Sequence, residues 1–485
     1  MKYNLLVFLS YTFAVPQGTR AANAATSVPW RSSSTEVENE VDAGSVAGAT
    51  DVDFTTKHQE ELMKFSRASV LGRNESQPHF TWNTIEQTIR TSQKGKVEKE
   101  GTFCYSVFGM NIDVTQLELL KTAIFYGLLS CTLAFLWTPL LTKLLYKYKI
   151  TRRGEYDASL GIEGRQAKSG VPIMGGLVVI ITVTVLTIAF NWDRSFTWVP
   201  IGVMLLAALL GGVDDVMNIY GKKRRLRKIS QTLRLIRVHS DWRQRIWLTL
   251  TLPWTAFKRI SLWLGSHPGK GLHVHERLLL QFLAGGVTAW WVYFKLGEHW
   301  REIHIPFDGY INIGWWIMPL IIVFVMASAN AVNFTDGMDG LAGGALITTF
   351  SALGLLSWFG GYKEIMILNT MTVGALITYT YFNVKPARFQ MGDTGSLGLG
   401  ALLAINAIVI NQMLLLPFLG FIFYLELGSV VLQIGGRYIL GRRILKMAPL
   451  HHHFELRGWS EEKVVMRFWF IHMAVVLLGI WIALF

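Results

Sequence analysis

Acids, amides and imidazoles gather in four short polar clusters of this chain, and each cluster stands at the end of an apolar segment. The clusters are Asp214-Asp215, Asn330 to Asp339, Asn383 to Ser396 and Met447 to Glu455. Burying one carboxylate near a bilayer costs roughly 3 kcal/mol or more, so acids in such places are usually functional. Asp214-Asp215 alone could be a solvated acid pair at the end of a helix. Four such clusters in one chain instead favour a single shared site.

The second cluster has a polar residue at every third position, namely Asn330, Asn333, Asp336 and Asp339. On a helix or its last turn, this spacing places the side chains roughly along one side. Glycines from Gly337 onward allow a backbone or a ligand to approach closely. The alternative is helix packing through small residues, with the acids as caps. Two acids and two amides so close together make that alternative the weaker one.

Asp393 lies between glycines in the stretch Met391 to Ser396, just before an apolar segment. A carboxylate at a helix start suits the binding of a divalent metal ion or a phosphate. Capping of the helix by Asp393 or Ser396 is the alternative.

Three adjacent histidines, His451, His452 and His453, follow the string Met-Ala-Pro-Leu. Adjacent residues of a helix cannot all face one metal ion, so no zinc site is expected. Imidazoles can instead form hydrogen bonds with phosphate or sugar oxygens.

Together the clusters predict phosphoryl chemistry at a membrane. Carboxylates would hold Mg²⁺, which prefers oxygen ligands and shares its coordination shell with substrate phosphates. Lys168, with backbone amides, would offset the charge of a diphosphate. The metal would polarise the phosphoryl group and stabilise the leaving phosphate.

The elements that must position these clusters are membrane helices. Hydrophobic residues form 51% of the 485 residues, which predicts an all-α polytopic membrane protein. The length allows about ten spans of roughly 20 residues each. The predicted spans lie at about 123–146, 171–190, 197–213, 278–296, 314–332, 341–359, 364–382, 396–412, 414–436 and 465–485.

Loop charge predicts the orientation of these spans, because cytoplasmic loops carry an excess of Lys and Arg. The basic loops fall within 143–168, 222–277, 385–388 and 442–457. All four polar clusters lie on the same side as these loops, so we expect a cytoplasmic-face active site. Both termini would then be extracytoplasmic.

Three regions are expected along the chain. Residues 1–24 resemble a secretory signal segment, with an ordinary disordered start as the alternative. Residues 25–115 are polar and are expected to form a disordered extracytoplasmic extension. Residues 116–485 form the helical domain, interrupted by a basic cytoplasmic insertion at 222–275. The two cysteines make a disulfide framework unexpected.

The insertion at 222–275 carries thirteen Lys and Arg residues against one acid, Asp241, for a net charge of 13 − 1 = +12. Its aliphatic and aromatic residues predict amphipathic helices lying on anionic lipid headgroups. A solvated basic loop is the alternative. Nucleic-acid binding is not expected, because the aromatic residues are mixed with aliphatic ones.

At this point the motifs match a known family. The chain from about Thr115 to Phe485 resembles the phospho-MurNAc-pentapeptide translocases, the bacterial lipid I synthases of the polyprenyl-phosphate N-acetylhexosamine-1-phosphate transferase superfamily. The resemblance rests on five strings in order: Lys168 to Gly176, Val213 to Asp215, Asn330 to Gly340, Met391 to Ser396 and Met447 to Glu455. The histidine string looks specific to the muramoyl branch.

The resemblance implies ten transmembrane helices with a broken ninth helix, often a homodimer, in the bacterial inner membrane. It also implies a Mg²⁺-dependent reaction in which undecaprenyl phosphate attacks the β-phosphorus of UDP-MurNAc-pentapeptide and UMP leaves. By motif position, Asp214, Asp215, Asp393 and His452 are catalytic, with Asp214 a candidate base and Asp393 the Mg²⁺ ligand. The implied substrate-binding residues are Lys168, Asn333, Asp336, Asp339, Asn383, Ser396, His451 and His453.

This sequence departs from the family pattern at several positions. Val171 and Ile173 replace threonines, Gln390 stands where an aromatic is usual, and Arg277 replaces a lysine. Val171, Ile173 and Gln390 lie near the expected nucleoside pocket. The family pattern therefore does not predict which residues contact the base.

Other functions are still open on the sequence alone. A sibling transferase would use UDP-GlcNAc, although the histidine string argues against it. A transporter would also bury acids in helices, and an inactive scaffold would use the basic insertion to recruit partners. Within the transferase reading, an already ionised phosphate nucleophile favours direct displacement over a phosphorylated enzyme intermediate.

Overall fold

The structure is a computed structural model that describes residues 105–107, 110–112, 114–151, 170–221, 229–253, 255, 271–272 and 274–485. The predicted signal segment, most of the 25–115 extension and Lys168 lie outside the described residues. A two-stranded antiparallel sheet of β1 (Tyr105–Val107) and β2 (Met110–Ile112) precedes the first helix.

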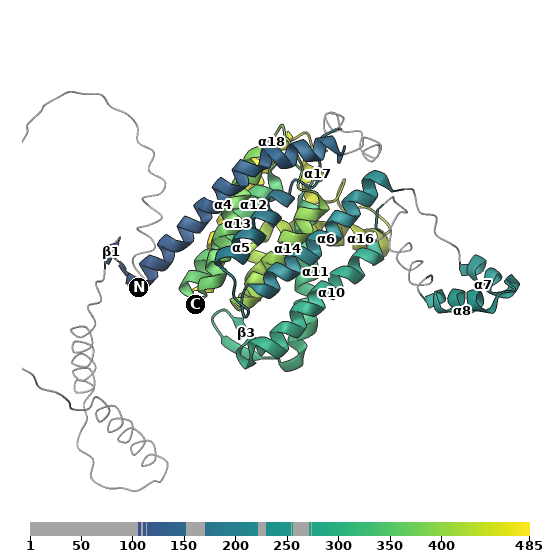
Figure 1. Ribbon diagram of the computed structural model, residues 1–485, viewed down its shortest axis with the longest axis horizontal. Helices are drawn as coiled ribbons and strands as arrows, with labels where there is room; N and C mark the ends of the chain where they lie inside the picture. The colour runs from purple at the N-terminus through teal and green to yellow at the C-terminus, as the bar shows by residue number, and fades with distance from the viewer. Residues whose placement is uncertain are drawn as a thin grey trace, which may run out of the picture. The chain divides into compact units, whose positions relative to one another are not determined.

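Helices dominate the described chain (Figure 1). The long ones are α4 (Val114–Lys147), α5 (Leu177–Phe190), α6 (Trp198–Tyr220), α10 (Val274–Trp291), α11 (Ile317–Thr335), α12 (Leu341–Phe359), α13 (Lys363–Asn383), α14 (Gly392–Val409), α16 (Phe421–Ile439) and α18 (Glu461–Ala483). The shorter ones are α7 (Ile229–Val238), α8 (Trp242–Leu250), α15 (Leu416–Leu419) and α17 (Leu450–Glu455). A hairpin of β3 (Glu302–Ile305) and β4 (Gly309–Asn312) joins α10 to α11.

The all-α polytopic membrane architecture is confirmed, and every predicted span falls on a helix of this set. The count of ten is not confirmed. Within the described ranges, seven helices are long and apolar enough to cross a membrane, or up to eight with one bent pair. Helix α5 has only 14 residues, fewer than the ~20 that a bilayer requires.

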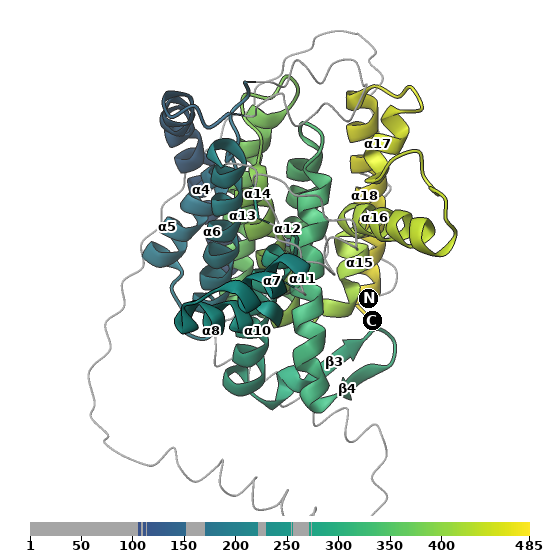
Figure 2. The same cartoon turned by 90° about the vertical axis from the view of Figure 1, so that its right-hand side faces the viewer.

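The bent pair lies where the family resemblance implied a broken helix. Residues Met413–Leu419 and Phe421–Ile439 meet at an angle of 90° around Gly420. Helix α16 consequently runs across the direction of α18 (Figure 2).

Helix α14 forms the centre of the bundle, because every side chain from Thr394 to Val409 is buried. It packs against α6 on one side and α11 on the other, while α13 packs against α4 and α12. Glycines set these close approaches. A Cβ atom at Gly211 of α6 would lie 2.1 Å from the Asp393 carbonyl oxygen, and one at Gly400 of α14 would lie 2.6 Å from the Ser328 carbonyl oxygen. Backbone contact at Gly211 therefore brings Asp214 of α6 beside the start of α14.

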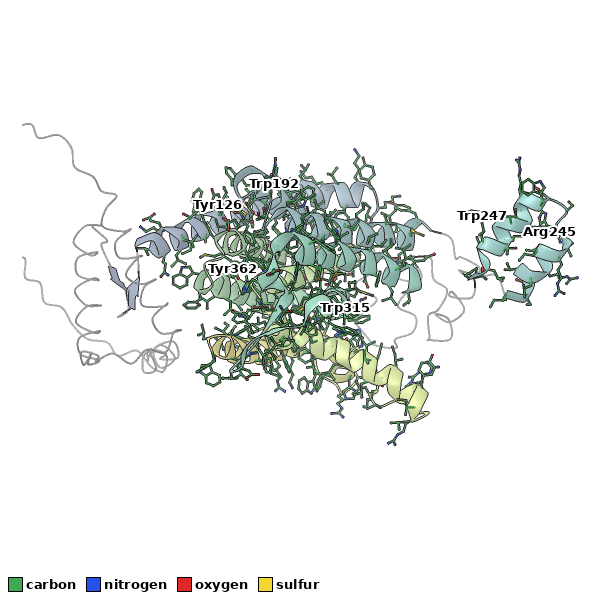
Figure 3. All side chains as sticks on the ribbon, turned by 90° about the horizontal axis from the view of Figure 1, so that it is seen from below. Tyr126, Trp192, Arg245, Trp247, Trp315 and Tyr362 are labelled. Carbon is green, nitrogen blue, oxygen red and sulfur yellow. The ribbon has the colours of Figure 1, made fainter. Side chains whose placement is uncertain are left out.

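The surface of the bundle has the features expected in a bilayer. Helix α4 exposes large apolar side chains such as Phe125, Leu128 and Leu136, which water would not favour. Aromatic side chains lie in the segments that precede α6, α11 and α13, at the helix ends opposite the polar clusters, and include Trp192, Trp315 and Tyr362. Figure 3 labels these three side chains. Aromatic belts of this kind lie at membrane–water interfaces.

Candidate active site

Three helix ends bring the first three polar clusters together. Asp214 and Asp215 lie near the end of α6, Asn333 near the end of α11, and Asp393 in the first turn of α14. The Asn333 Nδ2 atom donates to Asp393 Oδ1 at 2.7 Å and to Ser396 Oγ at 2.8 Å. The Ser396 hydroxyl in turn donates to the Gly392 carbonyl at 2.9 Å. The predicted convergence of these residues is therefore observed.

Asp215 caps the start of α14. Its carboxylate accepts from the Thr394 amide at 3.0 Å, the Thr394 hydroxyl at 2.7 Å and the Asp393 amide at 3.2 Å. An acid at a helix N-terminus pairs with unsatisfied amides and with the positive end of the helix dipole. Asp215 thus fixes the turn that presents the Asp393 side chain.

Asp214 is almost fully buried, at 1% exposure, and each of its oxygens is hydrogen-bonded. It accepts from the side-chain Nδ2 of Asn218 at 3.1 Å, from the Leu272 backbone amide and from the Arg277 guanidinium. The same Arg277 nitrogen, Nη2, lies 3.0 Å from Asp393 Oδ2. Its Nε atom is buried and has no hydrogen-bond partner among the residues that the structure describes. One cation thus bridges acids from two helices.

A cavity of about 380 Å³ opens beside these acids. Three carboxylates face it, those of Asp215, Asp336 and Asp393, together with the guanidinium of Arg277. Its remaining lining residues are Thr151, Ile173, Asn218, Ile219, Gln390 and Gly392. Arg277 is one of three positions on the cavity wall that depart from the family pattern, and the other two are Ile173 and Gln390. The backbone joins them indirectly, since the Gln390 amide donates to the Pro172 carbonyl at 2.8 Å.

The loop after α11, which carries Asp336 and Asp339, bonds to the loop between α13 and α14 and to the start of α14. The Asp336 carboxylate accepts from the Gly392 amide at 3.2 Å. Asp339 accepts from the Ala387 amide at 3.4 Å. Asn383 is buried and accepts from the Gly340 amide at 2.9 Å while donating to the Phe389 carbonyl at 2.8 Å. Asp339 and Asn383 therefore hold the two loops in place around the cavity.

The histidine string folds as the short helix α17 and reaches the same loop. A Cβ atom at Gly337 would lie 2.2 Å from His451 Nε2, so only glycine fits beside this ring. The rings of His451 and His452 approach each other with their Nε2 atoms 3.1 Å apart. His452 Nδ1 lies 3.1 Å from Glu455 Oε2. The histidine cluster thus contacts Gly337, and the neighbouring residue Asp336 bonds to the start of α14. All four polar clusters therefore lie next to one another.

His453 faces the basic loop before α17. Its Nδ1 atom accepts from the Lys446 amide at 3.1 Å. Burial lowers the pKa of His453 below its ordinary value, and the nearby charges of Arg457 and Lys446 lower this pKa further. The neutral imidazole is the form that this environment favours.

Sequence reasoning missed two residues of the site. Glu426 of α16 is fully buried and accepts from the backbone amides of Leu450 and His451 and from His451 Nδ1. A lone acid inside an apolar helix was the signal that could have found it. Arg277 was noted only as a departure from a family lysine, and nothing in the sequence indicated that it bridges Asp214 and Asp393.

The donor set bears on the expected metal ion. Within the described ranges no three His, Cys, Asp or Glu side chains form a complete ligand cluster. Mg²⁺ does not require one, because proteins commonly bind it through one or two carboxylates together with water and substrate phosphates. The carboxylates that line the cavity fit that kind of site. Zinc, which takes three or four protein ligands, fits it poorly.

Comparison with known proteins agrees with this arrangement. A family model described as Glycosyl transferase family 4 matches residues 268–411. A phospho-N-acetylmuramoyl-pentapeptide-transferase of Chloroflexus aurantiacus is 34% identical over 347 residues, which cover 70% of this chain and 83% of that relative. Proteins with the same name from Levilactobacillus brevis and Halalkalibacterium halodurans are 30% and 31% identical, and the alignments cover 93% and 97% of their lengths. The chain therefore belongs to the phospho-N-acetylmuramoyl-pentapeptide-transferase family.

Proposed function

We propose that this protein transfers phospho-MurNAc-pentapeptide from UDP-MurNAc-pentapeptide to undecaprenyl phosphate, giving lipid I and UMP for peptidoglycan synthesis. The observation that carries the proposal is the cavity of about 380 Å³ lined by Asp215, Asp336, Asp393 and Arg277. It combines oxygen ligands for a divalent cation with a guanidinium for phosphate oxygens. The family's name supplies the substrate class, and the histidine string favours the muramoyl sugar over GlcNAc.

In the proposed reaction, an oxygen of the lipid phosphate forms a bond to the β-phosphorus of the nucleotide sugar. The bond from that phosphorus to the bridging oxygen breaks, and the oxygen leaves with UMP. The nucleophile is already an anion at neutral pH, so it needs no general base. This favours direct displacement without an enzyme-bound phosphate.

Mg²⁺ is part of the proposal, with Asp393 as its protein ligand. When bound, the metal would polarise the β-phosphoryl group and offset charge on the departing phosphate. Asn333 and Ser396 keep the Asp393 side chain in one orientation through the hydrogen bonds at 2.7 and 2.8 Å. Asp215 holds the backbone turn beneath it.

Arg277 and Asp214 act as a pair in this proposal. A guanidinium matches the geometry of phosphate oxygens and makes charge-assisted hydrogen bonds to them. Asp214 accepts a hydrogen bond from Arg277 and thereby positions it at the cavity wall. We infer that Asp214 acts through Arg277 rather than as a base.

The remaining site residues would bind the sugar and peptide part of the substrate. His451 lies beside Gly337 in the loop that carries Asp336. The three histidines of α17 are proposed to bind sugar or phosphate oxygens. Lys168 is proposed to contact the diphosphate. Asp339 and Asn383 support this pocket through the backbone.

The orientation is also a proposal. We place the site on the cytoplasmic side of the bacterial inner membrane, because basic residues gather at this end of the helices. Arg442, Arg443 and Lys446 lie between α16 and α17, and Arg388 lies between α13 and α14. A homodimer is proposed from the family resemblance.

The test uses the full chain in nanodiscs with undecaprenyl phosphate and measures UMP release and radiolabelled lipid I. Activity with UDP-MurNAc-pentapeptide that depends on Mg²⁺ supports the proposal. Product formed only from UDP-GlcNAc would assign the sibling reaction instead. A phosphorylated aspartate trapped in the absence of undecaprenyl phosphate would overturn direct displacement.

A further inference from the structure

Helices α7 and α8, within residues 229–250, form a small unit that the transfer reaction does not use. We call it the α7–α8 hairpin. Asp241 starts α8 by accepting a hydrogen bond from the Arg243 amide at 3.0 Å. Arg245 Nε donates to the Ile236 carbonyl at 2.9 Å and ties the two helices together. Sequence and local hydrogen bonding therefore account for both helices.

The hairpin has almost no interior of its own. Thr232 is its single buried residue among those described, whereas large apolar side chains lie on its surface. Val238, Trp247 and Leu250 are 75%, 67% and 70% exposed. Trp242 and Ile246 are also exposed and lie on the same side of α8 as Leu250, because residues four apart on a helix share a face. A water-facing helix would not be expected to present such a surface.

Basic side chains are interleaved with the apolar ones. The exposed arginines are Arg234, Arg237, Arg243 and Arg245, and the one acid between 229 and 253 is Asp241, which gives 4 − 1 = +3. The Arg243 guanidinium lies 5.7 Å from the centre of the Trp242 ring. Figure 3 shows the side chains of Arg245 and Trp247 on this hairpin.

The chain keeps the hairpin near the membrane. Helix α6, a membrane-spanning candidate, ends at Tyr220, and α7 begins at Ile229. Eight residues lie between them, and a fully extended chain of that length reaches at most about 30 Å. The hairpin returns to α10, whose first turns carry Arg277 of the candidate site. Both of its connections therefore lead to the end of the bundle that holds the site.

We propose that the α7–α8 hairpin docks on the anionic surface of the bilayer, with Trp242, Ile246, Trp247 and Leu250 in the headgroup region and the arginines on lipid phosphates. Tryptophan is favoured at that depth, and arginine is attracted to acidic lipids. A partner protein would have to offer acidic and apolar surface in the same pattern, whereas an anionic bilayer offers both everywhere. The inference does not depend on the proposed reaction.

The test measures the depth of spin labels on α8 in the full chain. The background replaces Cys104 and Cys131 with Ser, and single cysteines are introduced as Leu250→Cys and Gln244→Cys. Gln244 lies on another side of α8, six residues from Leu250 at about 100° each. Each protein is reconstituted in nanodiscs of phosphatidylcholine with or without phosphatidylglycerol. Electron paramagnetic resonance then gives the ratio of oxygen to nickel-chelate accessibility.

We expect the accessibility ratio at Leu250→Cys to rise several-fold when phosphatidylglycerol is present, while the ratio at Gln244→Cys stays low. Changing all four arginines to Glu should abolish the rise at Leu250→Cys, and changing them to Lys should retain most of it. High salt should weaken the rise, because exposed charges are screened.

Three results would overturn the inference. The first is a Leu250→Cys label with equal accessibility in both lipid compositions. The second is protection of that label that is independent of lipid and of the arginines, which would indicate a protein surface. The third is arginine-dependent binding of a labelled oligonucleotide without insertion of the label, which would indicate a nucleic acid.

Discussion

The Nη2 atom of Arg277 lies 3.0 Å from Asp393 Oδ2 and also donates to Asp214, so one cation joins acids from α6 and α14. The Asp214 carboxylate is buried, while Arg277 is 31% exposed and reaches the cavity wall. A divalent metal ion on Asp393 would therefore compete with this guanidinium, which would shift toward the phosphates of the substrate.

Replacing Arg277 tests this bridge. Arg277→Gln would leave a buried carboxylate without its cation, which costs about 3–5 kcal/mol in fully buried pairs and less at this partly exposed site. We expect a lower Tm in detergent and a fall in kcat/KM of about 100-fold. Arg277→Lys, which restores the charge and the usual family residue, should lose less. Equal activity of the Gln variant and the wild type would contradict the role of the bridge.

Asp393 is expected to control metal binding. Asp393→Ala should lower lipid I synthesis by roughly a thousandfold and weaken the binding of Mn²⁺, measured by its electron paramagnetic resonance signal, because the metal loses its carboxylate ligand. Asp308→Asn, an exposed acid in the loop of the β3–β4 hairpin, is the matched control and should change neither quantity. Unaltered Mn²⁺ affinity in the alanine variant would exclude Asp393 as the ligand.

Glu426 is expected to hold the histidine helix. Its carboxylate accepts from two backbone amides and from His451 Nδ1, so Glu426→Ala leaves three donors unsatisfied at roughly 1–3 kcal/mol each before relaxation. The KM for the nucleotide sugar should rise and the Tm should fall. Glu455→Gln, at a side chain that is 15% exposed and lies 3.1 Å from His452 Nδ1, should have a smaller effect on both. A KM unchanged in the Glu426 variant would separate α17 from substrate binding.

The crossing of α6 and α14 can be tested with two glycines of one helix. A methyl group at Gly211 would meet the Asp393 carbonyl at 2.1 Å, whereas one at Gly202 meets no atom within 4 Å. Gly211→Ala should therefore push the helices apart at a cost of about 1–3 kcal/mol and reduce activity. Gly202→Ala should preserve both Tm and activity. Similar behaviour of the two variants would disprove the crossing.

The lowered pKa of His453 predicts a dependence of stability on pH. Because the folded protein holds the proton less tightly than the unfolded chain, the unfolded state gains protons as the pH falls below 6.5. Stability should therefore decrease in that direction until the pH passes below the folded pKa. Thermal unfolding from pH 8 to pH 5 should show this decrease, and His453→Asn should flatten it. An identical profile in the variant would assign the effect to another group.

Much of this architecture followed from simple patterns. Apolar runs located every helix of the bundle, and the polar clusters at their ends identified Asp214, Asn333 and Asp393 as neighbours. The number of spans did not follow, because α5 is apolar yet has only 14 residues, and α10 is not among the candidate spans either. Helix length depends on where tertiary contacts end an element, which hydropathy does not record.

The hydrogen bonds within the candidate site could not be predicted from the sequence. Asp215 caps α14 and Glu426 accepts from His451 because particular helix ends meet in the fold. The hydrophobic periodicity of a single helix does not predict which helix ends meet. The roles of Lys168, the region before residue 105 and the full insertion at 222–275 stay predictions.

Because α14 is buried among other helices, the position of the candidate active site should not depend on the thickness of the bilayer. Since every side chain from Thr394 to Val409 is enclosed by other helices, neighbours within the protein set the tilt of α14. Helix α4, whose outward face is apolar, can instead tilt to match a thinner or thicker bilayer. The carboxylate at the head of α14 would then keep its position as the membrane composition changes during growth.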